Sequence, residues 1–164
     1  MASQEMIVRV VLVGMGATVV MDAWTMALRR LGVPVLDYAL VGRWVGHWRH
    51  GRFAHADIRQ ALAVRGEAAL GWGLHYATGV LFAGLLAGFA GQAWLRAPSP
   101  GPALAVGVAT VLLPWFVMQP ALGAGVASSR TPTPVRNCLR SVVTHAVFGL
   151  GMYLAAAAIV WAWP

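Results

Sequence analysis

Four long apolar runs dominate the pattern of hydrophobic and polar positions in this chain. They cover residues 6–28, 68–94, 102–127 and 139–161. A helix of about 20 residues crosses the roughly 30 Å hydrocarbon core of a bilayer, and a segment inside lipid must pair its own backbone groups. We therefore expect four transmembrane helices. Pro114 and Pro120 lie inside the third run, where they should kink the helix without ending it.

The composition supports this interpretation. Hydrophobic residues make up 59% of the 164 residues and charged residues only 10%, whereas about a quarter of the residues in an ordinary soluble domain are charged. Four spans leave little sequence for a separate soluble domain, so we expect a single all-α transmembrane domain over residues 1–164. The one cysteine, Cys138, cannot form a disulfide within the chain.

The arginines predict the orientation in the membrane. The connection 29–67 contains Arg29, Arg30, Arg43, Arg49, Arg52, Arg59 and Arg65, and the connection before the fourth span contains Arg130, Arg136 and Arg140. The connection between the second and third spans contains Arg96 alone. Basic loops stay in the cytoplasm, so both termini should be periplasmic. Trp94, Trp161 and Trp163 would then fit an aromatic belt at the outer interface.

The first connection contains an amphipathic pattern over residues 36–48. Leu36, Leu40, Trp44 and Trp48 recur every four residues, while Arg43, His47 and His50 fall on the other side. This spacing predicts a helix lying in the cytoplasmic interface, with its tryptophans at the headgroup level. Gly51 should end this helix, and a second short polar helix should follow over residues 56–64.

Two other interpretations of this basic stretch stay open. Arg43, Arg49 and Arg52, with Arg130 from the other basic connection, could hold an anionic lipid headgroup or another phosphate. Alternatively His47, His50 and His55 could bind a metal ion, although the neighbouring arginines would repel a cation. We do not expect nucleic acid as a partner, because the chain contains no recognisable nucleic-acid module.

Ionisable residues inside the spans predict a second candidate site. Asp22, His75 and His145 lie at similar depths from the cytoplasmic ends of their spans, and Gln119 could join them. Small polar stripes surround them, formed by Gly14 and Thr18, by Gly71 and Gly79, and by Ser141 and Gly149. Asp22, His75 and His145 could bind a divalent metal or a proton. The alternative is a hydrogen bond that only holds the helices together.

The spans also show an internal similarity. Ala17, Thr18 and Val19 in the first span match Ala109, Thr110 and Val111 in the third, and His75 with Gly79 matches His145 with Gly149. The pattern predicts two tandem helical hairpins, with the basic connection inserted into the first.

Five sequence segments, taken together, resemble a known family. They are GATVVMD, YALVGRWVGH, GRFAH, GEAALGWGLHYATG and QPALGAGVASSRTPTP. The set resembles a family of small bacterial inner-membrane proteins known only as a domain of unknown function. This resemblance covers nearly the whole chain. It implies four spans and a bacterial cytoplasmic membrane, and it implies no activity, cofactor or catalytic residue.

Three classes of function remain after these observations. The first is binding of a small ligand, proton or metal at Asp22, His75 and His145. The second is a scaffold or accessory subunit that acts by assembly with itself or with a partner. The third, an enzyme acting on lipid or quinone, has least support because the sequence contains no GxSxG, HExxH or phosphate-loop motif. The sequence does not identify a cofactor or decide whether the protein is an enzyme.

Overall fold

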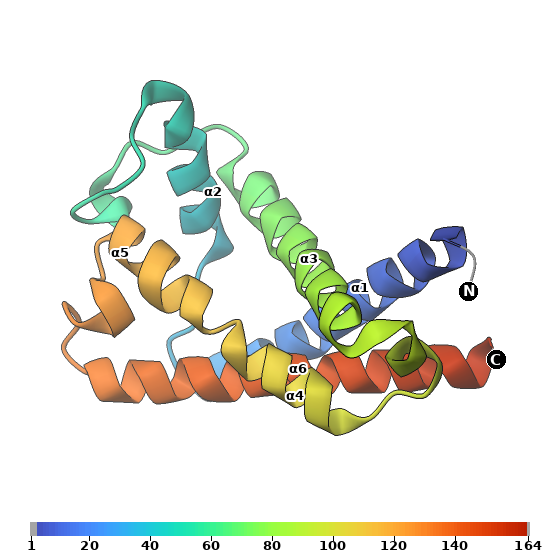
Figure 1. Ribbon diagram of the computed structural model, residues 1–164. Helices are drawn as coiled ribbons and strands as arrows, with labels where there is room; N and C mark the ends of the chain where they lie inside the picture. The colour runs from blue at the N-terminus through green and yellow to red at the C-terminus, as the bar shows by residue number, and fades with distance from the viewer. Residues whose placement is uncertain (1–2, 164) are drawn as a thin grey trace. The chain divides into compact units, whose positions relative to one another are not determined.

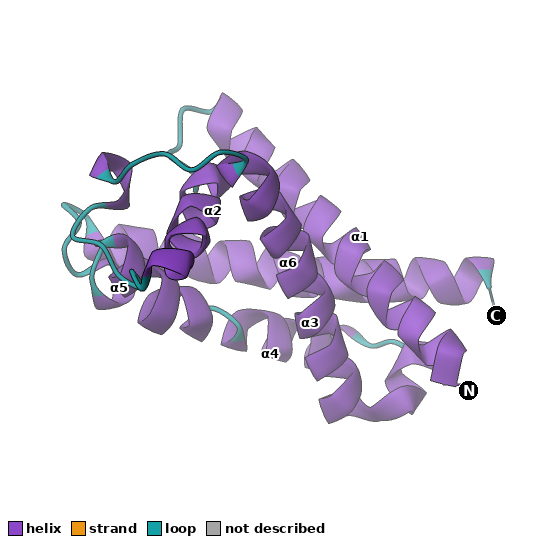
Figure 2. Cartoon of the chain, turned by 90° about the horizontal axis from the view of Figure 1, so that it is seen from above, coloured by secondary structure: helices purple, strands orange, loops and turns teal. Residues whose placement is uncertain are grey.

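The computed structural model describes residues 3–163, and in that range every regular element is a helix (Figures 1 and 2). The three long helices are α1 (Ser3–Arg30), α3 (Glu67–Arg96) and α6 (Pro134–Ala162). A further stretch, Pro100–Leu122, combines α4 (Pro100–Ala109), a π-helical turn (Pro114–Met118) and α5 (Gln119–Leu122). These four stretches are long and apolar enough to cross a membrane. The predicted all-α, four-span architecture is confirmed.

The third span differs from the prediction in two ways: its helix is interrupted, and it ends earlier than expected. The chain leaves helical structure at Thr110 and Val111, because Pro114 has no N–H to donate to the Thr110 carbonyl and its ring crowds that carbonyl. The π-helical turn follows at once. The span ends at Leu122 and not at residue 127, since Gly123 takes a left-handed conformation with φ 99°. The residues after it form a separate short turn, Val126–Ser128.

The chain forms two compact units. Unit 1 comprises Met1–Val35, Tyr76–Thr110 and Val143–Pro164, and unit 2 comprises Leu36–His75 and Val111–Val142. The boundaries between the units fall within α3 and α6 and next to the break that follows α4.

Unit 1 is packed by apolar and small side chains. Its core contains Val13, Ala17, Leu86, Phe148 and Met152, each at most 3% exposed. A Cβ atom on Gly14 would lie 2.5 Å from the Val80 Cα, and one on Gly107 would lie 2.5 Å from the Gly149 Cα. Helix backbones approach this closely only at residues without a side chain. The small-residue stripes predicted for these spans therefore act as helix contacts.

Trp94 is buried and does not face lipid as an aromatic-belt residue would, while its level in the membrane stays a prediction. It is 5% exposed, belongs to the core of unit 1, and donates its indole N–H to the Ser99 carbonyl at 3.0 Å. Trp161, at 88% exposed, does present its ring to the surroundings. Three residues before Trp94, α3 breaks at Gly91, where φ is 76° and ψ is 169°, a conformation open almost only to glycine.

Unit 2 contains the helix of the first connection. This helix, α2 (Tyr38–His47), continues as a 3-10 turn (Trp48–His50), and Gly51 ends it with φ 70°. Asp37 caps its start by accepting from the Ala39 N–H at 2.9 Å. The predicted helix and its end at Gly51 are thus present, while its location in the interface stays a prediction. The second helix predicted over residues 56–64 is reduced to the turn Ile58–Gln60.

Candidate functional site

Helix α2 packs directly on the first turns of α3. A Cβ on Gly42 would collide with the Glu67 carbonyl oxygen, and a Cβ on Gly71 would collide with the Tyr38 carbonyl oxygen. Two glycines thus bring the backbones into contact, and the Arg43 and His47 side chains contact carbonyl groups in the rest of the connection. Gly46 similarly approaches the Val64 side chain. The polar side of α2 is therefore covered by protein.

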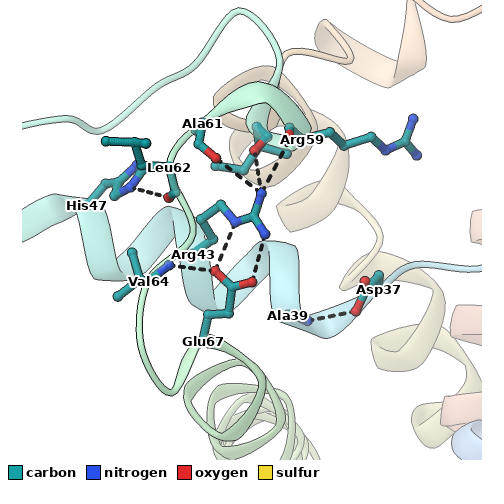
Figure 3. A network of polar contacts seen from close by, with 10 residues as sticks. Asp37, Ala39, Arg43, His47, Arg59, Ala61, Leu62, Val64 and Glu67 are labelled. Carbon is teal, nitrogen blue, oxygen red and sulfur yellow. Dashed lines mark hydrogen bonds and ion pairs between the residues drawn. The ribbon is translucent and has the colours of Figure 1, made fainter.

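Arg43 joins α2 to α3 through a two-pronged ion pair (Figure 3). Its Nε and Nη2 donate to the two carboxylate oxygens of Glu67 at 2.9 and 2.7 Å. Its Nη1 lies 3.2–3.4 Å from the carbonyl oxygens of Ile58, Arg59 and Ala61. The two side chains are 15% and 17% exposed. Such a paired, largely covered arrangement is costly to break from one side.

Glu67 also organises the segment before α3. One of its carboxylate oxygens accepts the Val64 N–H at 2.8 Å (Figure 3). The hydrogen bond to this carboxylate raises the pKa of Arg43 above its ordinary value, so the guanidinium stays charged and committed to Glu67. The geometry gives Arg43 a structural role and leaves anion binding to other arginines.

His47 and His55 form a pair beside this network. Nδ1 of His47 lies 2.7 Å from Nε2 of His55, and Nε2 of His47 lies 3.0 Å from the Leu62 carbonyl oxygen. A carbonyl can only accept, so Nε2 of His47 carries a proton. In a neutral His47 the other nitrogen, Nδ1, must then accept, and the proton shared by the pair is on Nε2 of His55.

This assignment leaves Nδ1 of His55 as a lone pair. The atom is buried and has no hydrogen-bond partner among residues 3–163. Burial, followed by the repulsion of His47 and Arg52, lowers the pKa of His55 below its ordinary value, and the nearby Ala121 backbone opposes this shift. The His55 N–H donates to the Ala121 carbonyl at 2.8 Å. Burial therefore favours the neutral form of His55, and the His55 backbone links the first connection to α5.

An open cavity of about 430 Å³ adjoins the histidine pair. Its lining residues are His47, Arg49, His50, Arg52, Leu62, Ala63 and Val64. None of these lining residues is acidic. Nε of Arg49 donates to Nε2 of His50 at 3.1 Å. Within the described part of the chain, the Arg49 terminal amino groups and the Arg52 guanidinium have no protein hydrogen-bond partner.

The structure thus divides the arginines predicted to hold an anion. Arg49 and Arg52 line one cavity, whereas Arg43 is bound to Glu67. Arg130 lies on the other connection of unit 2, is exposed, and does not line the cavity. Its backbone N–H donates to the Ala124 carbonyl at 2.9 Å.

The residues predicted for the intramembrane site belong to both units. In unit 1, Asp22 accepts from the Tyr76 hydroxyl at 2.9 Å. In the same unit, Nδ1 of His145 lies 2.8 Å from the Thr110 hydroxyl oxygen. That hydroxyl donates its one proton to the Gly107 carbonyl at 2.6 Å, so it accepts from Nδ1 of His145 and leaves Nε2 as the acceptor.

The two other residues of that prediction are in unit 2. Gln119 accepts from the Ser128 hydroxyl at 3.1 Å, and the His75 ring stacks on Tyr38 with ring centroids 4.0 Å apart. A shared layer of Asp22, His75 and His145 stays a prediction. Over residues 3–163, no group of three or more His, Cys, Asp or Glu side chains is arranged to hold a metal ion.

Sequence reasoning missed several partners in these sites. Glu67 follows Arg43 by 24 positions, too far for a local pattern to pair them. The sequence indicates Thr110 only through the internal similarity, and it indicates His55 only as a candidate metal ligand. The one available signal for Glu67 was its isolation, because it is the only acidic residue between Asp57 and the end of the chain.

Comparison with known proteins gives a family and no activity. No curated protein and no solved structure matches the chain. The family model described as "Protein of unknown function (DUF2938)" matches residues 11–159, which confirms the resemblance to a family of unknown function. With four helices able to cross a membrane, the chain is a multi-pass membrane protein, and it belongs to the DUF2938 family.

Proposed function

We propose that this membrane protein binds a phosphate-bearing anion in the cavity of its first connection. The observation that carries the proposal is the cavity lining, in which Arg49, Arg52, His47 and His50 meet without a carboxylate. An arginine guanidinium matches two phosphate oxygens at once. The cavity volume of about 430 Å³ lies in the range of small-molecule sites.

The other walls of the cavity do not compete with such a ligand. The Leu62 carbonyl is used by His47 and the Val64 N–H by Glu67. His47 is buried, with 7% of its surface exposed, and both its ring nitrogens are engaged. It therefore supports the shape of the cavity and is unsuited to act as a general base. These groups support binding of an anion and do not supply a nucleophile for its hydrolysis.

The orientation of the protein is part of the proposal. The family resemblance implies a bacterial inner membrane, and the arginine asymmetry favours both termini in the periplasm and the connection 29–67 in the cytoplasm. The cavity would then face cytoplasmic phosphate compounds and the headgroups of the inner leaflet. A periplasm-specific reporter fused after Gly51 should be inactive, and activity of that reporter would overturn the orientation.

Thermal unfolding of the detergent-purified protein tests the binding proposal. Inorganic phosphate should raise Tm relative to chloride at equal ionic strength, because a ligand that binds only the folded state stabilises it. The double variant Arg49→Gln/Arg52→Gln should lose this shift. The matched control is Arg59→Gln/Arg65→Gln, which removes the same charge from exposed positions outside the cavity. Equal shifts in all three proteins would overturn the proposal.

A second candidate is proton binding inside the membrane at Asp22. It is favoured by the hydrogen bond between its carboxylate and Tyr76 within an apolar span, since ionisable residues at such positions commonly mark proton or ion pathways. Asp22→Asn should abolish proton uptake and leave the protein folded. Unchanged proton uptake by this variant would exclude the candidate.

A further inference from the structure

A different surface of the first connection is formed by aromatic rings. Trp44 and Trp48 meet edge to face with ring centroids 5.1 Å apart, and the Phe53 ring lies 6.1 Å from Trp48. The Trp44 indole N–H donates to the Phe53 carbonyl at 2.7 Å. That bond folds the segment after Gly51 back onto α2, so the three residues form one aromatic cluster.

The aromatic cluster is presented to the surroundings. Phe53 is 62% exposed and Trp48 is 42% exposed. Neither ring belongs to the buried apolar core. Because the Trp44 indole N–H already has a protein acceptor, the cluster can leave water without losing that hydrogen bond.

We propose that the aromatic cluster of Trp44, Trp48 and Phe53 is a docking surface for the headgroup region of the protein's own anionic bilayer. The connection begins after α1 and ends at α3, which are both membrane spans, so both its ends lie at the same membrane surface. Tryptophan and phenylalanine rings on amphipathic helices enter that region.

Charge complementarity favours lipid over a soluble partner. Arg49 and Arg52 neighbour the cluster in sequence and are exposed, and basic residues at a membrane surface are attracted to anionic headgroups. Asp57, the nearest acidic residue after the cluster, is occupied in capping the turn Ile58–Gln60 by accepting the Arg59 N–H at 2.9 Å. The surface therefore combines apolar rings with net positive charge. The inference rests on these rings and not on the proposed anion cavity.

Spin labels in nanodiscs of phosphatidylethanolamine and phosphatidylglycerol test this proposal. In a Cys138→Ser background, single cysteines are introduced as Trp48→Cys, Phe53→Cys and, as the control, Gln60→Cys on the exposed turn Ile58–Gln60. Labels at 48 and 53 should be relaxed by lipid-soluble oxygen, and the label at 60 by an aqueous nickel complex. Replacing phosphatidylglycerol with phosphatidylcholine should make positions 48 and 53 shallower.

The outcomes separate the alternatives. Nickel accessibility at 48 and 53 equal to that at 60 would overturn the proposal, and protection of 48 and 53 from both reagents would indicate a protein partner in place of lipid. Arg49→Gln/Arg52→Gln should abolish phosphate stabilisation, while both labels stay oxygen-accessible and become shallower, as they do without phosphatidylglycerol. Trp48→Ser should leave phosphate stabilisation unchanged. The phosphate-binding proposal and the lipid-docking proposal can therefore be refuted independently.

Discussion

Unit 1 and unit 2 of this protein are held together by different interactions. Every residue of the buried apolar cluster lies in unit 1, where glycines also bring helix backbones into contact. Unit 2 buries few large apolar side chains, among them Ile58 and Val111. Glycines bring α2 and α3 together there too, and the connection is further held by the pair of Arg43 and Glu67 and by the pair of His47 and His55.

The difference follows from the two surroundings. Inside lipid, helices gain little from hiding apolar surface and associate by close packing. The first connection of unit 2 leaves the spans, and there a charged network with complete partners can hold a polar chain around a cavity. Apart from the ion pair of Arg9 and Glu5 near the start of α1, sensitivity to pH and to charge substitutions should therefore concentrate in unit 2.

The largest effect should come from Gly71→Ala in unit 2. The added Cβ would collide with the Tyr38 carbonyl oxygen, so α2 must separate from α3 at a cost of about 3 kcal/mol, the upper end of the usual range for overpacking. Gly73→Ala is the matched control, because a Cβ there has no neighbour within 4 Å. Chemical denaturation in mild detergent measures both variants. Equal stability of the two would show that α2 does not pack on α3 as described.

Breaking the ion pair should have the next largest effect. Arg43→Gln or Glu67→Gln alone should each cost about 3 kcal/mol, because each leaves a covered charge without its partner. The double variant should cost clearly less than the sum of the two, giving a coupling energy of about 1–3 kcal/mol. Arg59→Gln, whose exposed guanidinium points away from the network in Figure 3, should change stability by less than about 0.5 kcal/mol. Additive costs would contradict the pairing.

The pH dependence of stability should arise from His55. Its folded-state pKa lies below the ordinary 6.5, so the unfolded chain takes up the proton first as the pH falls. The stabilising contribution is therefore complete above about pH 6.5 and is lost as the pH falls through the lowered pKa. His55→Gln keeps a donor to His47 but does not titrate, and its Tm should vary less between pH 7 and 5. His50→Gln, at an exposed position, should retain the wild-type profile.

The smallest effect should be that of Tyr76→Phe in unit 1. The change removes the hydroxyl that donates to Asp22 at 2.9 Å, and hydrogen bonds between membrane helices contribute about 0.6 kcal/mol on average. Unfolding in bicelles at two pH values measures it. A loss above about 2 kcal/mol, or one that changes strongly with pH, would mean that unit 1 also depends on a charged network.

Much of the architecture follows from the sequence because lipid restricts it. The lengths of α1, α3 and α6, the end of the first connection's helix at Gly51, and the role of Gly14 and Gly149 in close packing all follow from apolar runs and small residues. At Thr110 and Val111 the helix is interrupted, whereas the sequence predicts only a kink. Pro114 shows where the helix is perturbed, but how far it opens depends on tertiary packing.

The candidate site was less predictable for a physical reason. The sequence does not distinguish the four arginines predicted to bind an anion. Arg43 differs from the others because it pairs with Glu67, and this pairing forms only when α2 packs on α3. The histidine pair depends on the segment 51–57 turning back toward α2, which no periodicity predicts. The burial of Trp94 does not follow from its position near the end of an apolar run, because tertiary packing decides which side of the helix is covered.

Calorimetric titration of nanodisc-embedded protein with inorganic phosphate tests the central claim most directly. We expect saturable binding at pH 7 to the wild type and to Arg59→Gln/Arg65→Gln, and at least tenfold weaker binding to Arg49→Gln/Arg52→Gln, a loss of about 1.4 kcal/mol or more. Phosphate binding of the same affinity to all three proteins, or to none of them, would contradict an anion site in the cavity lined by Arg49 and Arg52.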